Sequence, residues 1–408
     1  MIDVGSADAR LVAADPAITG MAEVLAPLGL VQRLAPHWDV VAARVSYLRY
    51  KPGTSLVAGL VLTDSAGATS AAQALALGPG APAKLAKVAL AGEADDVGRG
   101  AVVDERAGVA LSDVTADRHL PGVRRVLRRV PTVTQLVYKP GRRWVAREDH
   151  DGQAPLLVKA HRSGALRELL AGYRALQGLP VAGVVKVRER HGTITHPWVP
   201  GRPLDQVVDA TAPGLWDRAG ALLAQLHHRP LVDDLARVDR DTQLAAAVAA
   251  VRAVLPPDLT AEARATAERV RAGLAGRTVT RVVHGDFSAD QVIVRPDLAA
   301  LDVAAATEQP ELTIVDLDRV GVDDPLADLA SWYGALVAAA DAAGDPVDVL
   351  DPLLSGYHAA GGVADPELLR LHCAAAVLQR ATEPFRRHLP DWPERAARLV
   401  GTARELAS

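Results

Sequence analysis

The stretch VHGDFSADQVIV (residues 283–294) combines two apolar runs with a short polar loop between them. A glycine next to an acid between apolar runs is typical of a tight turn. Such a turn holds Asp286 at the end of a strand, and catalytic side chains often lie on loops that a scaffold fixes in this way. The stretch LTIVDLD (312–318) repeats the pattern, because an apolar strand again ends in acids.

The bulk composition describes a globular chain. It has 408 residues, of which 49% are hydrophobic, and a formal net charge of -4. This length suggests two or three domains, and the negative charge argues against a nucleic-acid partner. No apolar run reaches the length of a membrane span and no signal-peptide pattern is visible, so we expect a cytoplasmic protein without a membrane partner. The single Cys373 excludes an intramolecular disulfide.

Two similar hairpins are predicted in the first 150 residues. SYLRYKPGTSLVAGLVL (46–62) and QLVYKPGRRWVA (135–146) each read as two strands around a Pro-Gly turn. An internal duplication is one interpretation, and chance recurrence of a Pro-Gly hairpin is the other. Only the second copy has a lysine in its third strand, PLLVKA (155–160), since residues 70–77 of the first copy contain none.

The His-Gly-Asp turn, the amide side chain five residues after Asp286 and the strand ending at Asp316 together resemble small-molecule kinases of the aminoglycoside phosphotransferase and choline kinase type. The stretch VDDPLADLA (322–330) also resembles that family. The resemblance implies an α+β, bilobal protein-kinase-like fold with an extra N-terminal α/β cap subdomain. Its parts would be the cap at 1–130, a nucleotide-binding N-lobe at 131–200 and a mostly helical C-lobe at 201–408.

The resemblance also implies catalytic roles. Asp286 would be the general base that orients the acceptor hydroxyl and takes its proton. Gln291 and Asp316 would hold Mg²⁺, with Asp318 assisting a second metal ion. His284 and Asp328 would support the catalytic loop, Asp328 from the start of a helix.

A nucleotide site is implied in the second hairpin region. Kinases use a strand lysine to grip the phosphates of ATP and a helix glutamate to orient that lysine, and Lys159 with Glu168 fits this pair. The alternative is a solvated lysine and a surface glutamate. In the turn 139–143, backbone N–H groups and the side chains of Arg142 or Arg143 would face the phosphates.

The segment GTITHPWVPGRPL (192–204) resembles the connection between the two lobes of these kinases. Adenine would then be held by the Pro197 carbonyl, which proline retains although it lacks an N–H group, and by the Val199 N–H. A simple strand-to-loop transition is the alternative.

Acceptor specificity in this family belongs to the C-terminal helices. The stretch TEPFRRHLPDWPE (382–394) contains acids and aromatic rings that suit an acceptor with hydroxyls and an ammonium group. Glu383 and Trp392 are the main candidates, with Asp391 as a further one. Helix-end packing and solvated charges are the alternative.

This chain has Gln291 where aminoglycoside kinases have an asparagine. A glutamine at this position resembles maltokinases and actinobacterial glucosamine kinases. We therefore expect ATP-dependent, Mg²⁺-requiring phosphorylation of a small sugar or amino sugar, with glucosamine (to glucosamine 6-phosphate) first, maltose second, and an aminoglycoside or other small alcohol third. A nucleotide-binding pseudokinase or regulatory module is the alternative of another class, and the retained Lys159, Asp286 and Asp316 weigh against it. The protein would be a monomer or homodimer.

Two further segments carry weaker expectations. A helix is predicted over 216–228, and His227 and His228 at its end are interpreted as favourable cations at a helix C-terminus rather than metal ligands. Residues 295–312 are predicted to form a long loop, for which the sequence indicates no function.

Overall fold

The computed structural model describes residues 5–79, 82–90, 94–130, 132–162, 164–207, 213–277, 279–295, 311–340 and 344–408, so most of the predicted loop 295–312 lies outside the described residues. The described chain divides into two compact units. The first comprises Met1–Leu166, Val185–Pro197 and Glu383–Arg395. The second comprises Arg167–Val184, Trp198–Thr382 and Ala396–Ser408.

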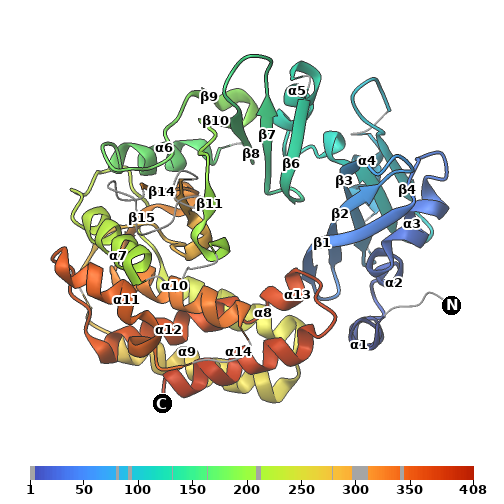
Figure 1. The fold of residues 1–408 in the computed structure, drawn as a ribbon. Coiled ribbons are helices and arrows are strands. Elements are labelled where there is room, and N and C mark those ends of the chain that lie inside the picture. The colour runs from blue at the N-terminus through green and yellow to red at the C-terminus, as the bar shows by residue number, and fades with distance from the viewer. Residues whose placement is uncertain are drawn as a thin grey trace. The chain divides into compact units, whose positions relative to one another are not determined.

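The first unit contains two five-stranded sheets whose neighbouring strands are all antiparallel (Figure 1). The first sheet has the order β1-β2-β3-β5-β4 and the second has the order β6-β7-β8-β10-β9. The strands of the first sheet are β1 (Ala42–Lys51), β2 (Ser55–Thr63), β3 (Thr69–Leu77), β4 (Ala101–Asp104) and β5 (Val109–Asp113). Those of the second are β6 (Thr132–Lys139), β7 (Arg143–Asp149), β8 (Leu156–His161), β9 (Lys186–Arg188) and β10 (Thr193–Pro197).

Both predicted hairpins are present. In the first, Lys51 pairs with Ser55 across the turn, and in the second, Lys139 pairs with Arg143. The glycine of each Pro-Gly turn adopts a positive φ, as such a turn requires. The equal strand order of the two sheets favours the duplication over chance recurrence.

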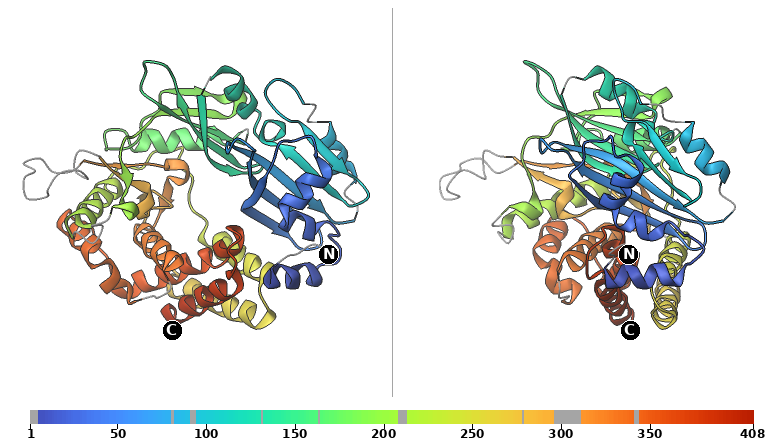
Figure 2. Two further views of the ribbon diagram at one scale, coloured as in Figure 1. Left: turned by 45° about the vertical axis from the view of Figure 1, so that its right-hand side comes forward. Right: turned by 90° about the vertical axis from the view of Figure 1, so that its right-hand side faces the viewer.

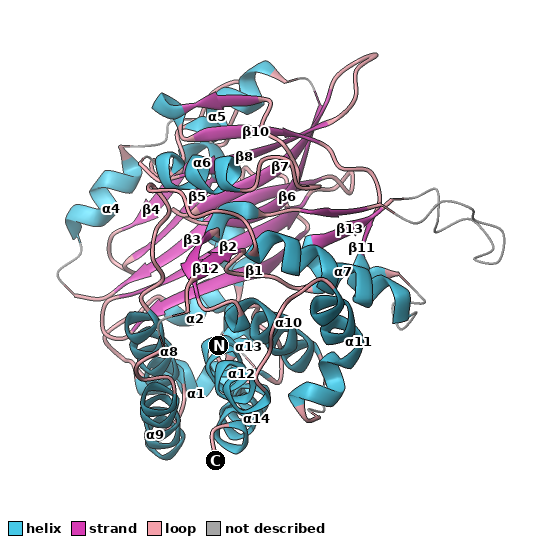
Figure 3. Ribbon diagram, turned by 90° about the vertical axis from the view of Figure 1, so that its left-hand side faces the viewer, coloured by secondary structure: helices cyan, strands magenta, loops and turns pink. Residues whose placement is uncertain are grey.

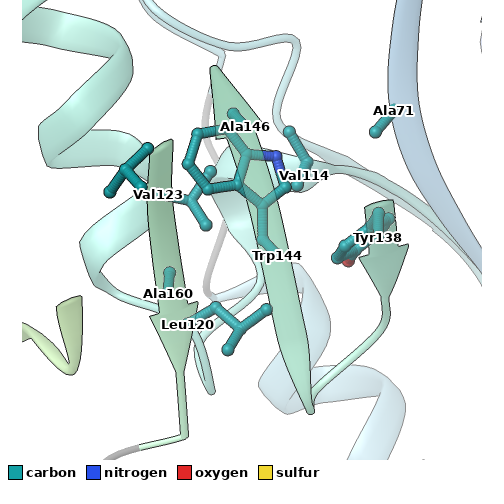
Figure 4. Close-up of a cluster of buried hydrophobic side chains, with 9 residues drawn as sticks. Ala71, Val114, Leu120, Val123, Tyr138, Trp144, Ala146 and Ala160 are labelled. Atoms are coloured by element: carbon teal, nitrogen blue, oxygen red, sulfur yellow. The ribbon is translucent and has the colours of Figure 1, made fainter. Parts of the chain in front are cut away.

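The helices of the first unit are short, and a buried cluster joins its parts. The helices are α1 (Ser6–Ala14), α2 (Met21–Leu25), α3 (Pro27–Leu34), α4 (Pro82–Ala89), α5 (Gly122–Arg129), α13 (Glu383–Arg386) and the start of α14 (Trp392–Leu406). Figure 4 shows the cluster, in which Trp144 of β7 packs with Leu120 and Val123 from the segment that connects the sheets. Trp144 is 1% exposed, so this packing buries its large apolar surface.

The second unit consists mainly of helices, with two small antiparallel sheets. The sheets are β11 (Arg202–Pro203), β13 (Val292–Val294) and β14 (Leu312–Ile314), and β12 (Arg281–Val283) with β15 (Gly321–Asp323). Its helices are most of α6 (Leu166–Ala175), then α7 (Pro213–His227), α8 (Arg240–Val254), α9 (Pro257–Gly273), α10 (Leu326–Ala339), α11 (Pro346–Ala359), α12 (Pro366–Arg380) and the rest of α14.

The helices of this unit pack in pairs. Helix α7 lies against α11, and α10 lies against α12; α10 to α12 are the orange to red helices in Figure 2. Helices α8 and α9 lie side by side (Figure 3). The helix predicted over 216–228 is present as α7, which begins at Pro213 and ends at His227. Within the described residues, none of the helices is long and apolar enough to cross a membrane.

Candidate active site

The loop that carries Asp286 begins where β12 ends, and its backbone conformation depends on glycine. Gly285 has a φ of 79°, in the left-handed region that other residues rarely adopt. A Cβ atom at this position would lie 2.3 Å from the carbonyl oxygen of Arg319. The predicted tight turn therefore needs glycine for two reasons, and it presents Asp286 immediately after the strand.

The carboxylate of Asp328 holds this loop in place. It accepts the backbone N–H of His284 at 2.7 Å and that of Gly285 at 2.8 Å. Asp328 lies in the first turn of α10 and is fully buried. The His284 ring makes a second contact that holds the loop, because its Nε2 lies 3.0 Å from the carbonyl oxygen of Val315. The loop is thus fixed from α10 and from the chain that follows β14.

His227 ends α7, but its contacts are not those expected of a cation that interacts only with a helix end. Its ring is buried, and Nε2 donates to the Asp328 carboxylate at 3.1 Å, since a carboxylate can only accept. The other ring nitrogen, Nδ1, lies 2.9 Å from the hydroxyl of Tyr357 in α11. A sequence with His227 at the end of a helix contains no sign of this contact, because its partners lie 101 and 130 residues away.

Ionised Asp328 stabilises the fold. Burial alone would raise its pKa, but the hydrogen bond and charge of His227, together with His284, lower the pKa of Asp328 below its ordinary value. A carboxyl whose pKa is depressed by folding contributes stability that is complete above its unfolded pKa of about 3.9. That contribution is lost as the pH falls through the lower, folded pKa.

We therefore expect Asp328→Ala to lower the free energy of unfolding by about 3–5 kcal/mol at pH 7, because it leaves His227 and two backbone N–H groups buried without their acceptor. Urea unfolding measures this value, and the gap to the wild-type protein should narrow when the pH is lowered below about 4. Asp234→Ala is the control, since Asp234 forms an exposed ion pair with Arg174 and should cost about 0–1 kcal/mol. Equal losses in the two variants would contradict this role of Asp328.

Two arginines contact Asp286, and sequence reasoning missed both. Arg380 of α12 places Nη2 3.2 Å from one carboxylate oxygen, and Arg319 places Nη1 3.3 Å from the other. Arg380 also lies 3.4 Å from the hydroxyl of Ser331 in α10. Its side chain is 17% exposed, whereas that of Arg319 is 66% exposed. Arg380 is therefore a fixed partner of Asp286, and Arg319 is a solvated one.

The predicted metal ligands Gln291 and Asp316 lie at adjacent ends of β13 and β14. These strands pair antiparallel, and the Val315 N–H donates to the main-chain oxygen of Gln291 at 2.9 Å. Asp316 follows with a φ of 60°, a left-handed conformation that is uncommon for a residue other than glycine and often marks functional sites. Asp318 follows within the short helical turn Leu317–Arg319.

These donors fit a magnesium ion. Mg²⁺ prefers oxygen ligands and is often held by one or two carboxylates, with substrate phosphates and water completing its shell. The amide of Gln291 and the carboxylate of Asp316 supply such oxygens. No group of three His, Cys, Asp or Glu side chains arranged for a metal was found within the part of the chain that the structure describes, which a site completed by phosphates does not require.

Asp290 is another residue that sequence reasoning left unassigned. Its carboxylate accepts the Ser288 hydroxyl at 2.5 Å and the Gln291 side-chain amide at 2.9 Å. The amide nitrogen of Gln291 is thereby oriented, which determines where its oxygen points. Burial, followed by the charge of Asp290, raises the pKa of Asp205 nearby.

Lys159 lies on β8, the central strand of the second sheet. It pairs with Val145 of β7 and with Ile194 of β10, and it is 4% exposed. A solvated strand-end lysine was the alternative interpretation, and this burial argues against it. Glu168 lies in the first turn of α6 with an exposed side chain. It belongs to the second unit, so its pairing with Lys159 stays a prediction.

The predicted nucleotide turn uses some of its own backbone donors. The Gly141 N–H donates to Asp117 at 2.7 Å, and the Arg142 N–H donates to the carbonyl of Lys139 at 3.0 Å. The Arg142 guanidinium contacts the hydroxyl of Tyr47 in β1 at 3.2 Å. Two of the N–H groups expected to face phosphates therefore have partners within the first unit.

The predicted adenine-binding segment coincides with the passage between the units. Pro197 ends β10 with an exposed side chain, and the chain enters the second unit at Trp198, one residue before Val199. The assignment of the Pro197 carbonyl and the Val199 N–H to adenine stays a prediction.

The acceptor candidates lie in the segment Glu383–Arg395 of the first unit, where Glu383 begins α13, Asp391 directly precedes α14 and Trp392 begins it. Trp392 is 4% exposed, its ring packs edge-on against Phe385 at 5.1 Å, and its indole N–H donates to Asp8 of α1 at 3.3 Å. Asp391 forms an exposed ion pair with Arg395 at 2.8 Å, and Glu383 begins α13. Their contact with an acceptor stays a prediction, and Trp392 has a packing role besides.

The chain thus presents Asp286 after β12, and Gln291 and Asp316 at the adjacent ends of β13 and β14, and these are residue types that phosphoryl transfer uses. A model of the phosphotransferase enzyme family matches residues 131–372, more than half of the chain. The chain belongs to this family. It is a small-molecule kinase that transfers a phosphoryl group to a hydroxyl, as the sequence predicted.

Solved structures show the same fold. A choline/ethanolamine kinase family protein from Mesorhizobium loti is 18% identical, with a TM-score of 0.50 over 70% of this chain and 94% of that chain. Aminoglycoside 2'-phosphotransferase-IIIa, solved with GDP, is 13% identical, with a TM-score of 0.50 over 71% of this chain and 99% of that one. None of the curated proteins matches the sequence. The predicted α+β kinase-like fold with an extra N-terminal subdomain is confirmed.

Proposed function

We propose that this kinase phosphorylates a hydroxyl of a small sugar or amino sugar, with ATP as the donor and Mg²⁺ as the metal. The observation that carries the proposal is the placement of Asp286. The Asp328 carboxylate holds the loop of Asp286 at the end of β12, and Gln291 and Asp316 lie at the adjacent ends of β13 and β14. Asp286 would accept the proton of the acceptor hydroxyl as it attacks the terminal phosphate of ATP.

The remaining residues would bind and orient the donor. Mg²⁺ held by Gln291 and Asp316 neutralises phosphate charge when bound, with Asp318 near a second ion. Lys159 would contact the phosphates, oriented by Glu168, and Arg143 would lie next to them. Arg380 contacts one oxygen of the Asp286 carboxylate at 3.2 Å, and it would help to orient that carboxylate toward the acceptor hydroxyl.

Glucosamine is the first candidate acceptor and maltose the second. Gln291 in place of asparagine resembles the kinases of those two sugars, and Glu383 supplies a carboxylate for an ammonium group. Glu383 follows Arg380 by three residues in the sequence. Asp391 and Trp392 complete the proposed acceptor segment.

The test is ADP release from ATP and Mg²⁺ across glucosamine, glucose, N-acetylglucosamine, maltose, choline, kanamycin and homoserine, with Asp286→Asn as the blank. Activity confined to glucosamine supports the proposal as stated, and activity on maltose selects the second candidate. Activity on choline, kanamycin or homoserine alone would replace the sugar with that acceptor. ATP binding without turnover of any compound in the panel would overturn the sugar proposal in favour of an untested acceptor or the nucleotide-binding pseudokinase.

Glu383→Gln tests the acceptor assignment. It removes the charge but keeps the shape of the side chain, so we expect KM for glucosamine to rise about tenfold, as a hydrogen bond to a charged group is worth about 1.5–3 kcal/mol. KM for the neutral analogue glucose should change less than about twofold, because its hydroxyl can still bond to the amide. Glu367→Gln, at an exposed position in the first turn of α12, is the control. Equal changes for both sugars would remove Glu383 from the site.

A further inference from the structure

A buried carboxylate holds the predicted nucleotide turn from outside the hairpin. Asp117 lies in the segment between the two sheets and is 3% exposed. One of its oxygens accepts the Tyr138 hydroxyl at 3.0 Å and the Gly141 N–H at 2.7 Å. Burial, with the charge of Asp117, raises the pKa of Tyr138 well above its ordinary value, so the hydroxyl stays a donor.

The first hairpin has the same arrangement. Asp15 is 8% exposed, and one of its oxygens accepts the Tyr50 hydroxyl at 2.7 Å and the Gly53 N–H at 2.7 Å. In both hairpins the tyrosine comes two residues before the Pro-Gly turn and the glycine lies in that turn. We call each set of three residues an Asp-Tyr-Gly clamp.

The two clamps belong to two copies of one structural unit. Residues 15–25 and 117–127 share the pattern D-x-x-[IL]-x-G-[MV]-x-x-V-L. The first strand of each sheet also contains one irregularity, between Val45 and Tyr47 and between Gln135 and Val137, and the two differ in position by two residues when Tyr50 is aligned with Tyr138. The duplication that the hairpins suggested thus extends to their clamps.

The copies also agree at their fifth strands. Gly108 and Gly192 precede these strands with φ values of 68° and 65°. The carbonyl of Gly108 accepts the Leu77 N–H at 2.9 Å, and that of Gly192 accepts the His161 N–H at 2.8 Å. The copies thus match at the aspartate, tyrosine and glycine of the clamp and at the glycine before the fifth strand. Agreement at these positions is not expected from chance recurrence of a hairpin.

The copies differ at the position that a kinase needs. In the second sheet, Val145 of β7 pairs with Lys159 of β8. In the first sheet, the corresponding Val57 of β2 pairs with Leu75 of β3. Leu75 therefore takes the place of Lys159, so the first copy keeps the clamp without the lysine that would contact phosphates.

The second turn is also packed more tightly than the first. Pro140 is buried, whereas residues 51–54 of the first turn are exposed. A Cβ atom on Gly59 of β2 would lie 3.1 Å from Pro140 Cδ, so the first sheet supports the second turn. Tyr138 belongs to the buried cluster that joins the two sheets (Figure 4).

We propose that Asp117 is a positioning residue for nucleotide binding: it fixes the turn 139–143 in the one conformation that places Lys139 and Arg143 beside the phosphates. Asp15 forms the same clamp on the hairpin to which the proposed function assigns no nucleotide. The inference rests on the proposed function, because that function assigns this turn to ATP. It also gives the N-terminal copy a role as the support on which the nucleotide turn is held.

Asp117→Ala and Asp15→Ala form a pair in the full chain, because each removes the bonds from the tyrosine hydroxyl and the glycine N–H of the same kind of turn. Asp117→Ala also removes the bond from the His119 N–H to the other carboxylate oxygen, at 3.0 Å. We expect Asp117→Ala to raise the Kd for a fluorescent ATP analogue and KM for ATP about tenfold. KM for the acceptor should stay unchanged. Asp15→Ala should lower Tm by a similar amount while leaving Kd and KM for ATP within about twofold of the wild-type values.

Tyr138→Phe and Tyr50→Phe form a milder pair that keeps both carboxylates and both rings, in case the alanine variants do not fold. Only Tyr138→Phe should weaken nucleotide binding, by about threefold. Equal nucleotide affinities for the two members of each pair would overturn the positioning role of Asp117 and leave the kinase proposal intact. A wild-type protein that binds no ATP analogue would overturn both.

Discussion

Asp286→Asn is expected to lower kcat by about 10²–10⁴-fold, the range over which a positioned general base contributes. Asparagine keeps the shape of the side chain and an oxygen that can still accept from Arg380, which lies 3.2 Å from Asp286. It cannot accept the proton of the attacking hydroxyl. The loop should remain in place because the Asp328 bonds go to the backbone of His284 and Gly285 and not to Asp286.

Three measurements separate this loss from damage to the fold. Tm and the Kd for an ATP analogue should match those of the wild-type protein, and kcat and kcat/KM should fall together, as they do when an interaction made only in the transition state is removed. Asp241→Asn is the isosteric control, since Asp241 forms an exposed pair with Arg271. Activity of Asp286→Asn within tenfold of the wild-type value would falsify its assignment as the base.

Asp316→Asn is expected to lower kcat about 100-fold or more, because the charge stabilisation from a bound metal is worth several kcal/mol and each 1.4 kcal/mol is a factor of ten. Asparagine tolerates the left-handed backbone better than most residues, so the φ of 60° at this position can be kept. The variant changes the charge of the ligand and leaves the turn intact.

The dependence on Mg²⁺ distinguishes this role from a general loss of activity. The Mg²⁺ concentration that gives half-maximal binding of an ATP analogue should rise about tenfold or more in Asp316→Asn. Asp318→Asn, two residues away in the same short helical turn, should shift it less if Asp318 contributes only to a second ion. The opposite order of the two variants would exchange the assignments of Asp316 and Asp318.

Several parts of the site could be predicted from the sequence because they depend on near neighbours in the chain. The turn at Gly285 needs a positive φ and room for a carbonyl oxygen, and the sequence shows this directly as a glycine between an apolar strand and an acid. The Pro-Gly turns that follow Lys51 and Lys139 are local in the same sense. The order of these signals along the chain was sufficient to indicate the family.

Other contacts were invisible in the sequence because they join residues far apart in the chain. Asp286 meets Arg380 across 94 residues, and His227 meets Asp328 across 101. The indole of Trp392 donates to Asp8, 384 residues earlier, a packing contact that the sequence did not show beside the predicted acceptor role. An exposed and a buried aromatic look the same in a sequence.

The sequence by itself thus determined the strands, the turns and the identity of the acid at the end of β12. Only the tertiary structure decided which charges surround that acid and which carboxylates hold the turns, as Asp328 holds one and Asp117 another. The physical reason is the range of the interactions. Turn conformation depends on sterics within a few residues, whereas a buried carboxylate needs donors that come together only when distant segments pack.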